Sequence, residues 1–358
     1  MSIFFKIEYF NPIAFLYELY KFSVFFFFFP LTLLSPKVTL NVAKKFLPIL
    51  LFLLFFNLLA TIAQHIFGGK ILITLGIKAN IFVGQIIGHS QKTGLLPGKN
   101  ISGAVNLYSF ILTLIILKYK SIFDIYKINI SNINLRALQI INLLGIVLSE
   151  SKNSIISLLI VIFIYWNIKN RYKFTIISTS FISIIVYMYS LNIFRLKDKI
   201  LSYVILAQNY QSFLNNIGSI YGKGVEERGI ELVKGIILII NNFPLGLGFG
   251  TWGDASASYN TAVKGKLVLY TDLSDSYLSH LFVEQGFLAF LYFFIIYLLI
   301  KNHGKVGFSI FFALIVFEGS TMGRSSAIAP LIIAFIFALL LVIEREKETK
   351  LDNNQKII

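Results

Sequence analysis

The stretch FLPILLFLLFFNLLATIAQHI, residues 46–66, contains no Asp, Glu, Lys or Arg. About 20 consecutive apolar residues are enough for a helix to cross the hydrocarbon core of a bilayer. Comparable stretches, several of them shorter, run over 13–34, 101–117, 135–149, 154–168, 174–194, 286–300, 306–318 and 327–343. The pattern predicts an all-α, polytopic transmembrane helical bundle of about nine helices, within a range of roughly eight to eleven.

The composition excludes an ordinary soluble fold. The chain has 358 residues, of which 56% are hydrophobic and 14% are charged, with a mean hydropathy of +0.77, whereas about a quarter of the residues of a soluble domain are charged. The predicted spans use the whole length, so we expect no separate soluble domain. There is no cysteine, which excludes disulfides and thiolate metal ligands.

The net charge of +15 indicates membrane topology rather than a nucleic-acid partner, because the basic residues fall in short runs between apolar segments. Such runs mark cytoplasmic loops. By contrast, residues 195–286 carry eight basic and eight acidic residues, so this stretch can cross the membrane. We expect three regions: 1–194 with about six transmembrane helices, 195–285 as an extracytoplasmic loop, and 286–358 with about three helices and a cytoplasmic tail.

The long loop contains a predicted amphipathic helix over 229–240, which ends before Asn241 because Pro244 forbids its continuation. A glycine-rich turn follows, with glycines at 246, 248 and 250. The turn lacks the preceding strand of a dinucleotide fingerprint and the lysine of a phosphate-binding loop. Two interpretations remain: a structural turn, or a turn whose backbone amides face a ligand anion.

A helix that opens at 274–281 and runs into the next span carries the candidate general base. Ser276, His280 and Glu284 are spaced so that they share one helical face, and Asp275 lies in the first turn. Asp275 or His280 is the candidate base. The alternative is that Asp275 only caps the helix and that His280 is a lone interfacial histidine. The other histidines have no metal-ligand spacing, so no metal site is predicted.

Three cations are predicted on the side of the long loop. Arg228 opens the loop helix, Lys152 lies in the short turn 149–154, and Arg324 follows Gly323. A guanidinium grips a diphosphate through two parallel hydrogen bonds. Lys152 is held at the membrane surface by the shortness of its turn, which suits a lipid headgroup. The alternatives are a solvated salt-bridge cluster around Arg228 and an ordinary loop charge at Arg324.

Several degenerate motifs occur in an order that resembles the O-antigen polymerase and O-antigen ligase superfamily. In chain order they are Thr93-Gly94-Leu95-Leu96-Pro97-Gly98-Lys99-Asn100 with Asn106, the turn Ser149 to Ser154, Arg228, Asn242-x-Pro244-Leu245-Gly246-x-Gly248-x-Gly250, Ser274-x-Ser276-Tyr277-Leu278, and Glu284-x-Gly286. The resemblance covers about residues 90–300 and also matches the predicted topology.

The resemblance implies a metal-independent glycosyltransferase of the bacterial cytoplasmic membrane that needs no cofactor. It would transfer glycan from undecaprenyl diphosphate to a sugar hydroxyl, with membrane lipids, a chain-length regulator and a flippase as partners and no nucleic acid. Its implied catalytic residues are Asp275, His280 and Arg228. Its implied substrate-binding residues are Lys152, Arg228, Gly248, Gly250, Glu284, Arg324 and Asn100.

Two departures from the family pattern bear on the reaction. In the family, the turn that corresponds to 149–154 usually has Arg where this chain has Lys152. Lysine keeps the positive charge but cannot make the two parallel hydrogen bonds of a guanidinium. Ligases carry a histidine before the final helix, where this chain reads Leu273-Ser274-Asp275-Ser276. We therefore expect a repeat-unit polymerase for O-antigen, capsule or exopolysaccharide. The alternatives are a ligase, a lipid-linked oligosaccharide transporter, which would show inverted repeats and broken helices, and a channel or scaffold subunit.

Overall fold

The computed structural model describes residues 12–13, 23–68, 71–74, 94–96, 99–167, 235–236, 238–248, 277–320 and 328–355. Regular secondary structure within these ranges is helical and includes no strand. The chain divides into two compact units: unit 1 comprises 1–18 with 163–294, and unit 2 comprises 19–162 with 295–358. The all-α prediction is confirmed for the described residues.

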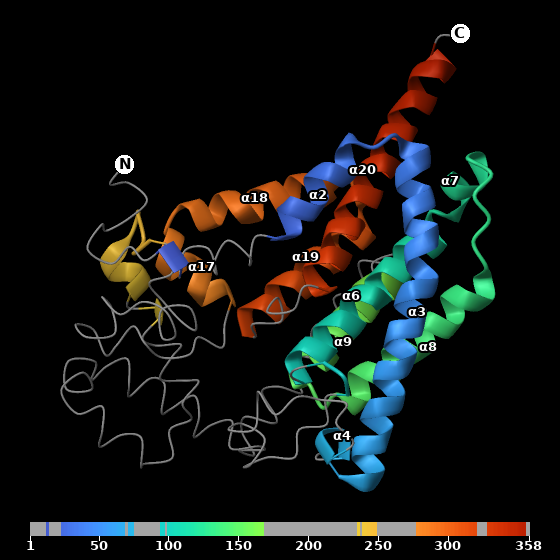
Figure 1. Ribbon diagram of the computed structural model, residues 1–358. Helices are drawn as coiled ribbons and strands as arrows, with labels where there is room; N and C mark the ends of the chain where they lie inside the picture. Colours follow the sequence, from blue (N-terminus) through green and yellow to red (C-terminus); the bar gives the residue numbers. More distant parts are fainter. Residues whose placement is uncertain are drawn as a thin grey trace, which may run out of the picture. The chain divides into compact units, whose positions relative to one another are not determined.

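The helices of the described residues are labelled in Figure 1 where there is room. In chain order they are α2 (Ser23–Leu33), α3 (Pro36–Phe67), α4 (Ile71–Thr74), α6 (Lys99–Lys118), α7 (Lys120–Ile125), α8 (Asn132–Leu148), α9 (Lys152–Asn167), α17 (Tyr277–Gln285), α18 (Leu288–Ile300), the 3-10 turn η5 (Lys301–His303), α19 (Lys305–Ser320) and α20 (Ile328–Gln355).

Three helical segments are long and apolar enough to cross a membrane, namely Pro36–Phe67, Asn100–Lys118 and Ile328–Glu346. Four shorter apolar segments accompany them: Asn132–Leu148, Asn153–Tyr165, Leu288–His303 and Lys305–Phe317. These lengths and compositions are those of a membrane protein. The predicted span 174–194 lies outside the described residues.

Two predicted boundaries were wrong at the charged ends of spans. Lys37, Lys44 and Lys45 were expected in a loop, yet α3 begins at Pro36 and includes them. Proline suits the first turn of a helix, where its missing N–H would have no partner. With 32 residues, α3 is about 48 Å long, which exceeds a hydrocarbon core of about 30 Å. The expected tail after 343 likewise continues as helix in α20.

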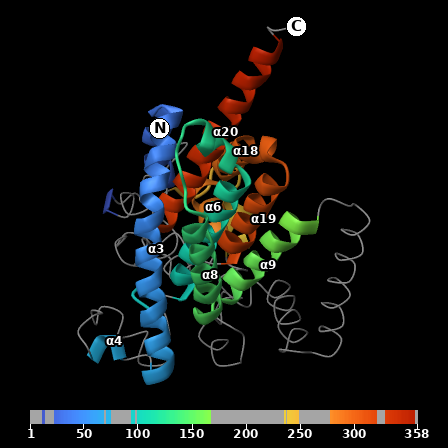
Figure 2. The ribbon, with the colours of Figure 1, turned by 90° about the vertical axis from the view of Figure 1, so that its right-hand side faces the viewer.

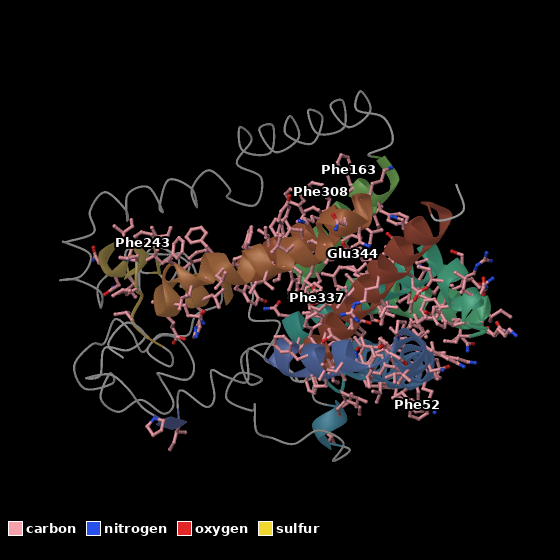
Figure 3. The ribbon with its side chains drawn as sticks, turned by 90° about the horizontal axis from the view of Figure 1, so that it is seen from above. Phe52, Phe163, Phe243, Phe308, Phe337 and Glu344 are labelled. Atoms are coloured by element: carbon pink, nitrogen blue, oxygen red, sulfur yellow. The ribbon has the colours of Figure 1, made fainter. Side chains whose placement is uncertain are left out.

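One stripe of α3 is buried in unit 2, and its members recur at alternating spacings of three and four residues. They are Leu40, Ala43, Leu47, Leu50, Leu54, Asn57, Thr61 and Gln64. This spacing keeps a seam facing neighbouring helices. The stripe packs against α8 and α20, which also contact α6, as Figure 2 shows. Figure 3 labels buried Phe337 on α20 and Phe52 on the exposed side of α3.

Unit 2 has two chemically different ends. At one end of unit 2, helices α3 and α8 end and helices α6 and α9 begin. We call it the amide end, because Asn and Gln side chains make its hydrogen bonds. At the other, which we call the basic end, α6 is followed by α7 (Figure 1). At this end Tyr126 donates a hydrogen bond to Glu346 of α20. The amide end holds both 94–96 and 149–151.

Candidate functional site

In unit 1, the glycine-rich turn follows a helix that continues two residues beyond its predicted end. Residues 238–242 are helical, so the predicted stop at Ile240 was wrong. The side-chain amide of Asn242 donates to the carbonyl oxygen of Leu238 (2.8 Å). The backbone carbonyl oxygen of Asn242 accepts from the amides of Leu245 (3.1 Å) and Gly246 (2.9 Å). Asn242 therefore closes the helix and starts the turn.

The turn caps the C-terminus of α17. The last carbonyl groups of a helix have no partner within it, and in this protein the amides of Leu247 and Gly248 donate to the carbonyls of Val283 (2.9 Å) and Glu284 (2.8 Å). In the opposite direction, the amide of Phe287 donates to the carbonyl of Pro244 (2.7 Å). We call this interlocked pair of segments, Pro244–Gly248 and Phe282–Phe287, the glycine clasp.

Two glycines leave no room for a side chain in the clasp. Gly286 has φ +53°, and its amide donates to the carbonyl of Phe282 (2.9 Å), which is the usual left-handed end of a helix. A Cβ on Gly286 would lie 2.2 Å from the carbonyl oxygen of Pro244, and one on Gly246 would lie 2.5 Å from that of Glu284. The clasp thus brings together two family-like motifs that are distant in sequence.

The clasp changes two expectations. A helix running unbroken from 274–281 into the next span was predicted, but α17 ends at Gln285 and α18 begins at Leu288 because Gly286 turns the chain. The amides of residues 246, 247 and 248 all donate to carbonyl groups of the protein. That geometry favours the structural interpretation of this part of the turn over anion binding. Gly250 lies outside the described residues.

His280 and Glu284 form a buried pair on α17. His280 Nε2 lies 3.3 Å from Glu284 Oε2, and each residue is only 2% exposed. The predicted shared face is confirmed for these two residues. Buried charges in proteins are normally paired, and this pair lies on the helix that the clasp caps. Leu238, Leu247 and Val283 pack together as the apolar cluster of the clasp.

At the amide end of unit 2, two side chains of α3 hold the turn at 94–96. Gln64 Oε1 accepts from the amide of Gly94 (2.7 Å), and Asn57 Oδ1 accepts from the amide of Leu95 (2.9 Å). The Asn57 Nδ2 group donates in turn to Ser102 Oγ on α6 (3.3 Å). The bond to Gly94 satisfies a buried backbone donor, which would otherwise be costly to leave without a partner.

The N-termini of α6 and α9 meet beside this turn. Ser151 Oγ donates to Asn100 Oδ1 (3.3 Å), and Ser154 Oγ donates to Ser151 Oγ (2.9 Å). The helices approach closely, because a Cβ on Gly103 would lie 2.1 Å from Ser154 Oγ. Each helix begins at a lysine, Lys99 in α6 and Lys152 in α9. The N-terminus of a helix carries a partial positive charge, and a lysine in the first position of each helix adds to it in sequence.

The structure describes five of the predicted site residues. Asn100, Gly248, His280 and Glu284 are described, and Lys152 is placed as the first residue of α9. Arg228, Gly250, Asp275 and Arg324 lie outside the described residues. Within the described part of the chain, no group of three His, Asp or Glu side chains could hold a metal ion.

Sequence reasoning missed the hydrogen-bonding face at the amide end. Its members are Asn57, Thr61 and Gln64 on α3, Ser102, Asn106 and Ser109 on α6, and Asn142 on α8, all buried. Asn142 Nδ2 donates to Ser109 Oγ (3.0 Å), which joins α8 to α6. The signal was present as polar residues recurring every three or four positions within otherwise apolar spans.

Comparison with known proteins gives no relative. No family model, no curated protein and no solved structure matches this chain.

Proposed function

We propose that this protein is a repeat-unit polymerase for a bacterial surface polysaccharide, such as an O-antigen, capsule or exopolysaccharide. It transfers glycan from undecaprenyl diphosphate to the sugar hydroxyl of an acceptor unit. In this proposal the chain is a multi-pass protein of the cytoplasmic membrane with about nine helices, and residues 195–285 are its extracytoplasmic loop.

The observation that carries the proposal is the meeting of α6 and α9 at their N-termini. Asn100 and the turn 149–154 come from separate family-like segments, and the Ser151–Asn100 hydrogen bond joins them. Helix N-termini attract anions, and a lysine begins each helix. A lipid diphosphate, whose charge lies at the membrane surface, is the kind of ligand that such an arrangement favours.

The chemistry divides into two tasks. The diphosphate leaves with increasing negative charge, which Lys152 stabilises together with Arg228 and Arg324. The acceptor hydroxyl must lose a proton, for which Asp275 and His280 are the candidate bases. Asn100 and Gly250 are the remaining candidates for contact with the glycan. Energy for the transfer comes from the activated donor, so the proposal includes no nucleotide and no cofactor.

The test is the surface glycan of a deletion strain, resolved on a gel. We expect a single repeat on each anchor, because ligation and export continue without the polymerase. Bare anchor, with polymer accumulating on undecaprenyl diphosphate, would assign a ligase instead. An unchanged ladder would refute the glycan assignment.

Complementation with point variants tests the diphosphate site. Lys152→Ala is expected to shorten the ladder strongly and Lys152→Arg to preserve it, because the cation is retained. Lys120→Ala is the matched control, since Lys120 Nζ contacts Asn132 Oδ1 (2.8 Å) at the basic end and should leave the ladder unchanged. A normal ladder from Lys152→Ala, with protein at the wild-type level, would remove Lys152 from the site.

A further inference from the structure

We infer that the exposed face of α3 binds a phospholipid with an anionic headgroup, in the leaflet at the basic end of unit 2. The ammonium groups of Lys44 and Lys45 bind the phosphate, and Ile49, Phe52 and Phe56 lie along an acyl chain. This lipid site is separate from the site proposed for the glycan donor, and its occupation requires no glycan.

The lipid face of α3 lies opposite the buried stripe of the same helix. Lys45, Ile49, Phe52 and Phe56 recur at spacings of four and three residues, so they share one side of the helix. Ile49 is 57% exposed, Phe52 62% and Phe56 44%, and Figure 3 labels Phe52 on this outer side. An apolar surface of this kind needs a cover, and in a membrane protein an acyl chain provides one.

The length of the apolar stretch places the two lysines at the headgroups. At about 1.5 Å per residue, residues 46–66 extend over roughly 31 Å, close to a hydrocarbon core of about 30 Å. One leaflet is about 15 Å deep, which corresponds to about ten residues of helix and reaches from Phe46 to Phe56. Lys44 and Lys45 directly precede this stretch, and a lysine side chain reaches toward the headgroups while its stem stays on apolar surface.

The described helices around this face provide no carboxylate for the two lysines. Neither α3 nor α8 contains Asp or Glu, and the first acidic residue of α20 is Glu344. The ring of Phe46 stacks on that of Phe335 in α20, with centroids 4.6 Å apart, and Glu344 follows Phe335 by nine residues, or about 13 Å along the helix. The charges of Lys44 and Lys45 are therefore complementary to a phosphate supplied by the membrane.

A second copy of this chain fits the face less well. Two copies inserted in the same direction would meet around an axis along the membrane normal, so that the same surface of each would face the other. Lys45 of both copies would then approach at one depth, where like charges repel. An anionic lipid brings the opposite charge to that depth.

The test is the quenching of tryptophan fluorescence by brominated lipids. In the full-length protein Trp166 and Trp252 are replaced by Phe, and Phe52→Trp places the single tryptophan on the lipid face. The protein is reconstituted in phosphatidylcholine vesicles with increasing fractions of phosphatidylglycerol or phosphatidylcholine that is brominated at mid-chain. We expect the anionic lipid to bind about five-fold more tightly than the zwitterionic lipid, because lysines near the membrane surface favour anionic lipids.

Lysine variants in this reporter protein test the phosphate contact. Lys44→Gln combined with Lys45→Gln should abolish the preference, whereas Lys44→Arg combined with Lys45→Arg should preserve it, because the charge remains. Lys301→Gln combined with Lys305→Gln is the matched control, since it removes the same charge from η5 and α19, and it should keep the preference. An equal loss in the control pair would reduce the effect to general attraction and overturn the site.

A second reporter tests whether the preference belongs to this part of α3. Phe67 is 71% exposed near the amide end of the helix, so Phe67→Trp in the same background should be quenched equally by the two lipids. Equal quenching of the Phe52→Trp protein by both lipids would overturn the inference. Absence of quenching by either lipid would also overturn it, because protein would then cover the face. No glycan is present in these vesicles, so the result is independent of the polymerase assignment.

Discussion

The amide end and the basic end of unit 2 are built from different interactions. At the amide end, buried uncharged side chains such as Asn57 and Gln64 bind backbone amides. At the basic end, half-exposed or exposed groups pair with carboxylates, as Tyr126 does with Glu346 and Asn302 with Glu344. The comparison indicates that one end of this bundle is fixed by desolvated hydrogen bonds and the other is held in contact with water.

This difference determines how each end responds to substitution. A buried polar group that loses its partner costs about 1–3 kcal/mol, because no water replaces the bond. An exposed polar pair contributes little, since water and salt compete with it. We therefore expect large effects at the amide end and small ones at the basic end.

The largest effect is expected from Gly94→Ala. Gly94 has φ +63°, and a Cβ there would lie 2.5 Å from the carbonyl oxygen of Asn57. Strain and overlap together should destabilise the protein by about 3 kcal/mol. Thermal unfolding in detergent measures the loss.

Gly304→Ala is the matched control for this change. Gly304 has a similar φ of +56°, but nothing lies within 4 Å of an added Cβ. The cost should therefore be limited to backbone strain, about 1 kcal/mol. Equal losses in the two variants would show that the turn at 94–96 is not held against α3 as the structure indicates.

The second largest effect is expected from the loss of the buried side-chain amide of Asn57. Asn57→Leu keeps the number and branching of the side-chain heavy atoms but removes the acceptor for the Leu95 amide and the donor to Ser102 Oγ. We expect a cost of about 2 kcal/mol in the free energy of unfolding. Asn132→Ala at the basic end also removes a side-chain partner, that of Lys120, and should change stability by less than about 0.5 kcal/mol because the site is exposed. If Asn132→Ala cost more stability than Asn57→Leu, the expected difference between the amide end and the basic end would be contradicted.

The smallest effect concerns Tyr126 and depends on pH. Burial, and then the hydrogen bond and charge of Glu346, raise the pKa of Tyr126 to about 12. Because the folded pKa lies above the unfolded value of about 10, the contribution is complete below about pH 10 and is lost as the pH rises toward 12. Tyr126→Phe should therefore lose less stability than wild type as the pH rises from about 10 to about 11. If wild type and Tyr126→Phe lost the same stability over that interval, the Tyr126–Glu346 pair would be excluded as the cause of the pH dependence.

The sequence predicted the apolar spans and missed what stops and joins them. The spans at 101–117 and 135–149 correspond closely to α6 and α8, because a run of apolar residues must be buried in lipid or protein whatever its neighbours are. The break at Gly286 was missed, since a glycine inside a helical pattern is compatible with either continuation or a cap. Only the contact with Pro244 decides between them.

The candidate site shows the same division. The spacing of His280 and Glu284 predicted a shared face, because four residues make about one helical turn. The approach of Asn100 to Ser151 had no local signal. The two residues are 51 positions apart, and only the packing of α6 against its neighbours brings them together.

By itself, the sequence determined that this is a membrane protein and that the residues which the structure describes form helices, because hydropathy and helical periodicity are properties of consecutive residues. The tertiary structure alone decided which polar residues share a site. Glycines at 94, 103, 145, 246 and 286 permit close approach only where a particular partner lies opposite. That partner comes from another segment, and its position is fixed by the packing of the whole unit rather than by any local pattern.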